Sequence, residues 1–136
     1  MLADHHVLCD LLREMGSAAW RVMDGDEASA GVLRQRLHAL GEPLGKHLEV
    51  EEERLRPILE PIADWGPQEL IYRHVFHVHL REAYDVLVEQ ADDGTEPPLL
   101  AAAALRLLRE LRQDLEEEEH DLLHPDALRM ERLASS

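Results

Sequence analysis

The sequence predicts an all-α protein, an up-down-up-down antiparallel four-helix bundle, from three observations. Apolar residues recur in steps of three and four along four long segments, which is the spacing of an amphipathic helix. Aromatic residues make up only 4% of the chain, so leucine, alanine and valine must form the core, as suits helices better than sheets. Short turn-forming stretches separate the segments, so consecutive helices should lie antiparallel. We expect all residues 1–136 to form a single domain.

Turn signals set the limits of each predicted helix. The stretches DGDE, EPIADWGP and ADDGTEPP interrupt the apolar pattern, and Pro67 and Pro98 suit the first turns of the third and fourth helices. Pro43 lies inside the second segment and lacks a backbone N–H, so we expect a kink or a break there. The helices are expected at about residues 2–24, 27–60, 67–91 and 98–124, followed by a short C-terminal tail.

Ionisable residues interrupt the apolar stripe of every predicted helix. Antiparallel neighbours meet where equal numbers of residues separate them from their shared turn, because each helix rises about 1.5 Å per residue. By this count, all four helices should bring an interrupting residue to a similar depth in the bundle. The interrupting residues are His5 on the first helix, His47 and Glu51 on the second, His74 and His77 on the third, and Asp114 and Glu118 on the fourth.

A shared buried position for these side chains predicts a metal site. Each residue alone could be an ordinary core or boundary residue, but burying several imidazoles and carboxylates together is costly unless they are paired or bind a metal. Arg81 is the only cation that we place near a stripe, so a core of ion pairs is not expected. Imidazole and carboxylate donors suit iron or manganese, and zinc less exclusively. A zincin is excluded because His-Glu-x-x-His is absent.

Four stretches of the chain resemble the hemerythrin-like, or HHE cation-binding, domains. These are DHHVLCDLL, HLEVEEERLRP, FHVHLREAYDVL and DLEEEEHDLLHP, and the resemblance covers about residues 2–125. It implies a four-helix bundle that holds a non-haem di-iron centre with carboxylate and oxo bridges. The donor types by themselves also allow manganese or zinc. The implied ligands are His5, His47, His77, Glu51 and Glu118, with His74 as a possible further one.

Two features of the implied centre concern its carboxylates. Glu51 and Glu118 would bridge the two metal ions. Asp114 stands where the family usually has a histidine. It could act as a more anionic ligand, leave an open coordination position, or weaken binding at one metal.

Composition excludes several classes of partner. The net charge is −15, from 29 acidic and 14 basic residues, so nucleic acid and anionic membrane surfaces should be repelled. The single cysteine, Cys9, cannot form an intramolecular disulfide. The N-terminus lacks a basic stretch followed by an apolar one. We therefore expect a cytoplasmic protein.

These observations leave three hypotheses about function. The first is a di-iron protein that binds, senses or handles O2, NO or peroxide, with an unidentified protein or redox partner. The second is a di-iron peroxidase-type or oxidase-type enzyme. The third is a metal-free bundle that acts as a protein-interaction module through its acidic surface. The sequence alone leaves open whether the protein is an enzyme.

Overall fold

The computed structural model describes residues 2–123, and the side chains of residues 5–117. Within these residues it contains four helices and no strand, which confirms the all-α class. Each helix begins and ends within two residues of its predicted limits, while the tail lies outside the described residues. The helices are α1 (Leu2–Met23), α2 (Ser29–Leu59), α3 (Gly66–Asp92) and α4 (Pro97–Leu123).

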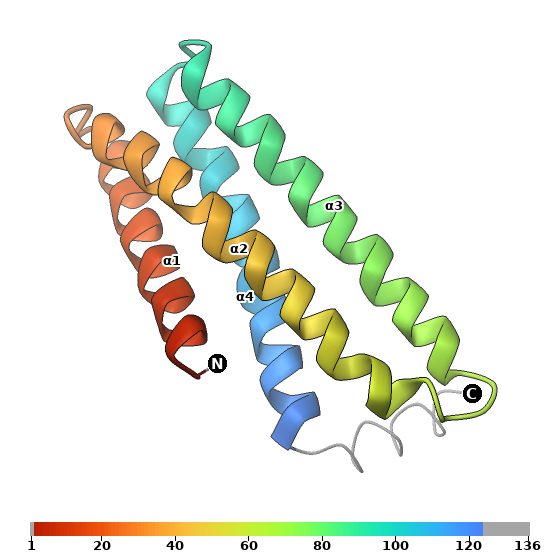
Figure 1. Ribbon diagram of the computed structural model, residues 1–136. Coiled ribbons are helices and arrows are strands. Elements are labelled where there is room, and N and C mark those ends of the chain that lie inside the picture. Colours follow the sequence, from red (N-terminus) through yellow and green to blue (C-terminus); the bar gives the residue numbers. More distant parts are fainter. Residues whose placement is uncertain (1, 124–136) are drawn as a thin grey trace.

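Short turns join the helices, and two of them need a glycine. Gly25 follows α1 with φ of 100°, and Gly94 follows α3 with φ of 83°, a left-handed conformation that glycine adopts without steric cost. Asp93 supports the second of these turns, because its carboxylate accepts hydrogen bonds from the backbone N–H and the hydroxyl of Thr95. These two turns lie at one end of the molecule, and the turn between α2 and α3 lies at the other (Figure 1).

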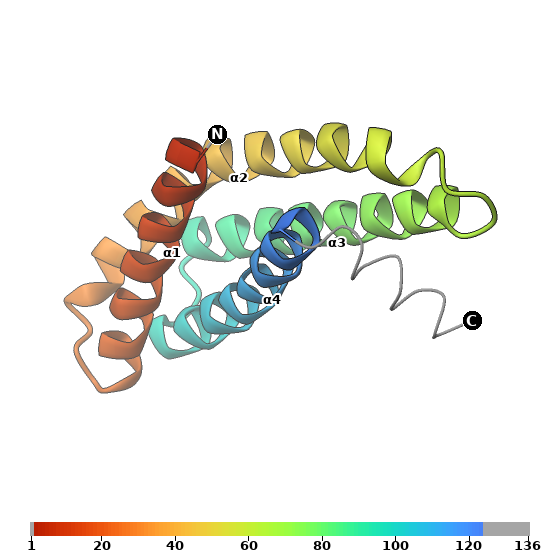
Figure 2. The ribbon, with the colours of Figure 1, turned by 90° about the horizontal axis from the view of Figure 1, so that it is seen from below.

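The helix α2 is not broken at Pro43. It runs unbroken through this proline and through Pro57, and Figure 2 shows that it changes direction along its length. A bend of this kind is expected where a proline removes a backbone donor inside a helix. Nearby, the hydroxyl of Tyr84 on α3 donates to the carbonyl of Leu37 at 2.5 Å. Gly41 makes room for this contact, since a Cβ there would lie 2.8 Å from the Tyr84 hydroxyl oxygen.

Leucines dominate the core, which consists of two clusters. The larger draws buried residues from all four helices, including Leu12, Leu44, Leu80 and Leu111. The smaller lies near the turn between α2 and α3, and consists of Leu55 and Leu59 with the partly buried Ile62, Trp65 and Leu70 around them. Buried ionisable residues fall between the two clusters along α2 and α3. No helix in the described part of the chain is long and apolar enough to cross a membrane.

Candidate metal centre

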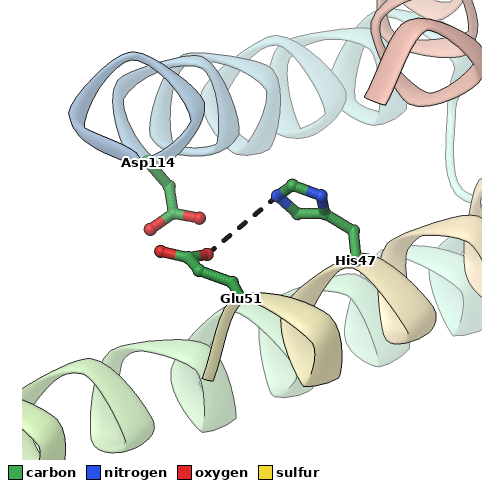
Figure 3. A group of neighbouring side chains, drawn as sticks. All are labelled: His47, Glu51 and Asp114. Carbon is green, nitrogen blue, oxygen red and sulfur yellow. Dashed lines mark ion pairs between the residues drawn. The ribbon is translucent and has the colours of Figure 1, made fainter. Parts of the chain in front are cut away.

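Three of the predicted residues converge in the interior of the bundle. His47 and Glu51 are four residues apart on α2, so both project from one face of the helix. Asp114 on α4 points towards Glu51 across the space between the helices, as Figure 3 shows. One potential ligand atom from each of the three residues lies within 4.8 Å of the other two. All three side chains are nearly inaccessible to solvent.

His77 on α3 adjoins this group of three. Its Nε2 atom lies 3.1 Å from Oε2 of Glu51 and 3.7 Å from Oδ1 of Asp114. The side chain is 2% exposed, so the ring belongs to the same water-poor interior. Helices α2, α3 and α4 therefore bring two imidazoles and two carboxylates together.

The other three predicted residues have different positions. His5 on α1 is partly buried, and the centroids of its ring and the ring of His47 are 6.0 Å apart, so it lies at the edge of the group. His74 is not brought into the group: its side chain is 64% exposed and its Nδ1 lies 3.1 Å from Glu52. The side chain of Glu118 lies outside the described residues.

Arg73 on α3 is buried beside the group, and the sequence analysis missed it. The residue is 4% exposed; its Nη1 donates to Glu51 at 3.4 Å and its Nε to Glu69 at 3.3 Å. The expectation that Arg81 is the only cation near a stripe was wrong, because Arg81 is exposed and donates to a backbone carbonyl of α2. The signal was present in the sequence: Glu69, Arg73 and His77 are spaced by four and share one helix face.

We call the five buried residues His47, Glu51, Arg73, His77 and Asp114 the polar layer. Burial alone lowers the pKa of His77, but its contacts with Asp114 and Glu51 outweigh burial and raise the pKa from 6.5 to about 10. Without a metal ion, His77 is therefore protonated at neutral pH. The positive charges of Arg73 and His77 then offset the negative charges of Glu51 and Asp114 in part, because Arg73 also pairs with the buried Glu69.

The donor set of the polar layer fits a metal ion. Both carboxylate oxygens of Asp114 are buried, and neither takes part in a hydrogen bond within the described part of the chain. Buried carboxylate oxygens are normally hydrogen-bonded or bound to a cation, because leaving them without partners is costly. Beside Asp114, His47 supplies an imidazole nitrogen and Glu51 supplies a further carboxylate oxygen. Iron, manganese and zinc all accept these donors.

Comparisons with known proteins give no further guide to this site. No protein-family model matches the chain, and no significant match was found among curated proteins or solved structures. The interpretation of the polar layer therefore depends on its own geometry and chemistry.

Proposed function

We propose that this chain is a metal-binding protein, an up-down-up-down bundle with a hemerythrin-like non-haem di-iron centre that binds, senses or handles O2, NO or peroxide. One observation carries the proposal: His47, Glu51 and Asp114 converge inside the bundle, and the Asp114 carboxylate has no hydrogen-bond partner among the described residues. A cation would satisfy that carboxylate and offset the negative charge at the same time.

In this proposal the group of three holds one metal ion. Among the residues whose side chains are described, His77 and His5 could supply donors for a second ion. Nε2 of His77 lies 3.1 Å from Glu51, and the ring centroids of His5 and His47 are 6.0 Å apart. The resemblance that suggests two ions also names Glu118 as the second bridging carboxylate. Asp114 takes the place of an expected histidine, which makes the donor set richer in oxygen and more anionic.

Iron would supply redox reactivity towards O2, NO or peroxide when bound. The chain's own residues supply the surroundings that such a site needs. Leu48, Leu80 and Leu111 are buried in the larger core cluster, and Leu55 is buried in the smaller. These apolar side chains exclude water from both ends of the polar layer, which favours small uncharged ligands. Arg73 holds one oxygen of Glu51 by a charged hydrogen bond and thereby restricts its orientation.

The charge balance of the polar layer favours a second candidate function. Arg73 and a protonated His77 offset most of the negative charge of the buried carboxylates Glu51, Glu69 and Asp114 without any metal ion. A chain that used only these ion pairs would be a metal-free bundle, and its acidic surface would serve as a protein-interaction module. This candidate predicts that chelators change neither colour nor stability.

Metal content separates the two candidates. The protein is expressed with added iron, purified without oxygen, and its iron per chain is measured by mass spectrometry together with the visible spectrum. We expect bound iron in the wild type, a large loss in Asp114→Asn, and no change in Glu116→Gln, which removes one charge from an exposed position of the same helix. Wild-type protein without iron, and without a change in stability on adding a chelator, would support the metal-free candidate instead.

A further inference from the structure

Glu52 lies next to Glu51 in the sequence but contacts the opposite side of the His77 ring. Its Oε1 is 3.0 Å from Nδ1 of His77, whereas Oε2 of Glu51 is 3.1 Å from Nε2 of the same ring. Successive residues of a helix point about 100° apart, so the two carboxylates leave α2 in different directions. Glu52 thus contacts the buried imidazole of His77 at Nδ1, and Glu51 contacts it at Nε2.

The contact with Glu52 determines which nitrogen of His77 faces the group of three. An ionised carboxylate can only accept a hydrogen bond, so Nδ1 must carry the proton that it donates to Glu52. The lone pair of Nε2 is then available on the side of Glu51 and Asp114 once that nitrogen is deprotonated. Histidines that bind metals are commonly held in this way by a carboxylate on their other nitrogen.

We propose that Glu52 is a positioning residue, which fixes the ring and the tautomer of His77 so that Nε2 is presented to a metal ion in the polar layer. The part of this inference that concerns the metal rests on the proposed function. Glu52 contacts the Nδ1 side of the ring, whereas Glu51 and Asp114 lie at Nε2, and its side chain is 26% exposed. In this proposal it therefore acts through His77 and not as a ligand.

His74 completes this arrangement on the solvent side. Its Nδ1 lies 3.1 Å from the same Oε1 atom of Glu52, and its side chain is 64% exposed. One carboxylate is thus held between an exposed imidazole and a buried one on successive turns of α3. His74 therefore supports Glu52 and is not itself a ligand, which explains why a histidine lies near the site without reaching the ligand atoms.

The first test measures Zn2+ affinity by competition with a chromophoric chelator. We expect Glu52→Ala to weaken binding about tenfold or more, as loss of such an outer partner usually does. Glu52→Gln should lose less, because its amide oxygen can still accept from Nδ1. Both variants remove the same charge, so equal losses would overturn the positioning role. Glu53→Gln, at an exposed position of α2, is the matched control and should bind as the wild type does.

The second test uses nitrogen NMR of the His77 ring and does not depend on metal affinity. In metal-free protein, the hydrogen-bonded Nδ1 proton of His77 should be observable in the wild type and in Glu53→Gln, and lost in Glu52→Ala. In Zn2+-loaded protein the metal should be on Nε2. Zinc on Nδ1, or an unchanged Nδ1 proton in Glu52→Ala, would refute the positioning role. A wild type that binds no metal but shows this proton pattern would sink the proposed function while retaining the positioning of His77.

Discussion

The stability of the metal-free protein should fall as the pH rises above neutrality, and His77 is the cause. Its pKa is about 10 in the folded protein and 6.5 in the unfolded chain. Below pH 6.5 both states are protonated, so the folded state has the full benefit of the charged ring beside two carboxylates. Between pH 6.5 and about 10 only the folded state holds this proton, so stability is progressively lost.

The size of the effect follows from the difference between the two pKa values. Each pKa unit corresponds to about 1.4 kcal/mol, so the whole contribution is on the order of a few kcal/mol. At most, the free energy of unfolding should fall by about 1.4 kcal/mol for each pH unit within this window. The carboxylates responsible, Glu51 and Asp114, are buried, so salt should screen the effect only weakly.

Urea unfolding in the presence of a chelator, from pH 6 to about pH 9.5, where most tyrosines remain un-ionised, measures this dependence. We compare the wild type with His77→Gln, and with His79→Gln as a control at an exposed position of the same helix. The wild type and His79→Gln should lose stability over this range, and His77→Gln should be less stable at pH 6 but much less dependent on pH. Equal slopes for all three proteins would refute the assignment of the charge to His77.

Three further predictions concern the core, one hydrogen bond between helices and the buried arginine, each measured by urea unfolding. Leu44→Ala should cost about 2–5 kcal/mol because its side chain is fully buried, whereas Leu99→Ala, 63% exposed, should change stability by about 0.5 kcal/mol or less. Tyr84→Phe should cost about 0.5–1.5 kcal/mol, the contribution of its hydrogen bond to the Leu37 carbonyl. Arg73→Met should cost about 3–5 kcal/mol in metal-free protein, since it leaves buried carboxylates without their cation; a near-neutral result would mean that they take up protons instead.

The helices and two of the converging residues could be predicted because their signals are local. Each helix has a long apolar period between turn residues, and His47 and Glu51 share a face simply by being four residues apart. Asp114 was also expected at this depth, since short turns fix the register of neighbouring helices. These predictions needed only spacing along the chain and the rise of a helix.

The buried face of α3 was harder to predict from the sequence, because that face contains ionisable residues, which are costly to bury without a partner. We expected His74 on the same stripe as His77, whereas the structure buries Glu69 and Arg73. Steps of three and four both fit a helix, and charged residues are not expected on a buried stripe. Burial of Arg73 is favourable because it pairs with Glu69 on the same helix and with Glu51 on α2. The spacing of Glu69 and Arg73 is a local signal, whereas the contact with Glu51, 22 residues away in the chain, has none.

The most direct test of the metal site is anomalous diffraction at the iron absorption edge, from crystals of protein loaded with ferrous iron under anaerobic conditions. We predict an anomalous peak inside the bundle, within bonding distance of His47, Glu51 and Asp114. The position of any second peak would show whether His77 and His5 complete a di-iron centre. A well-ordered polar layer without an anomalous peak, and with Arg73 and His77 still paired to the carboxylates, would contradict the metal site.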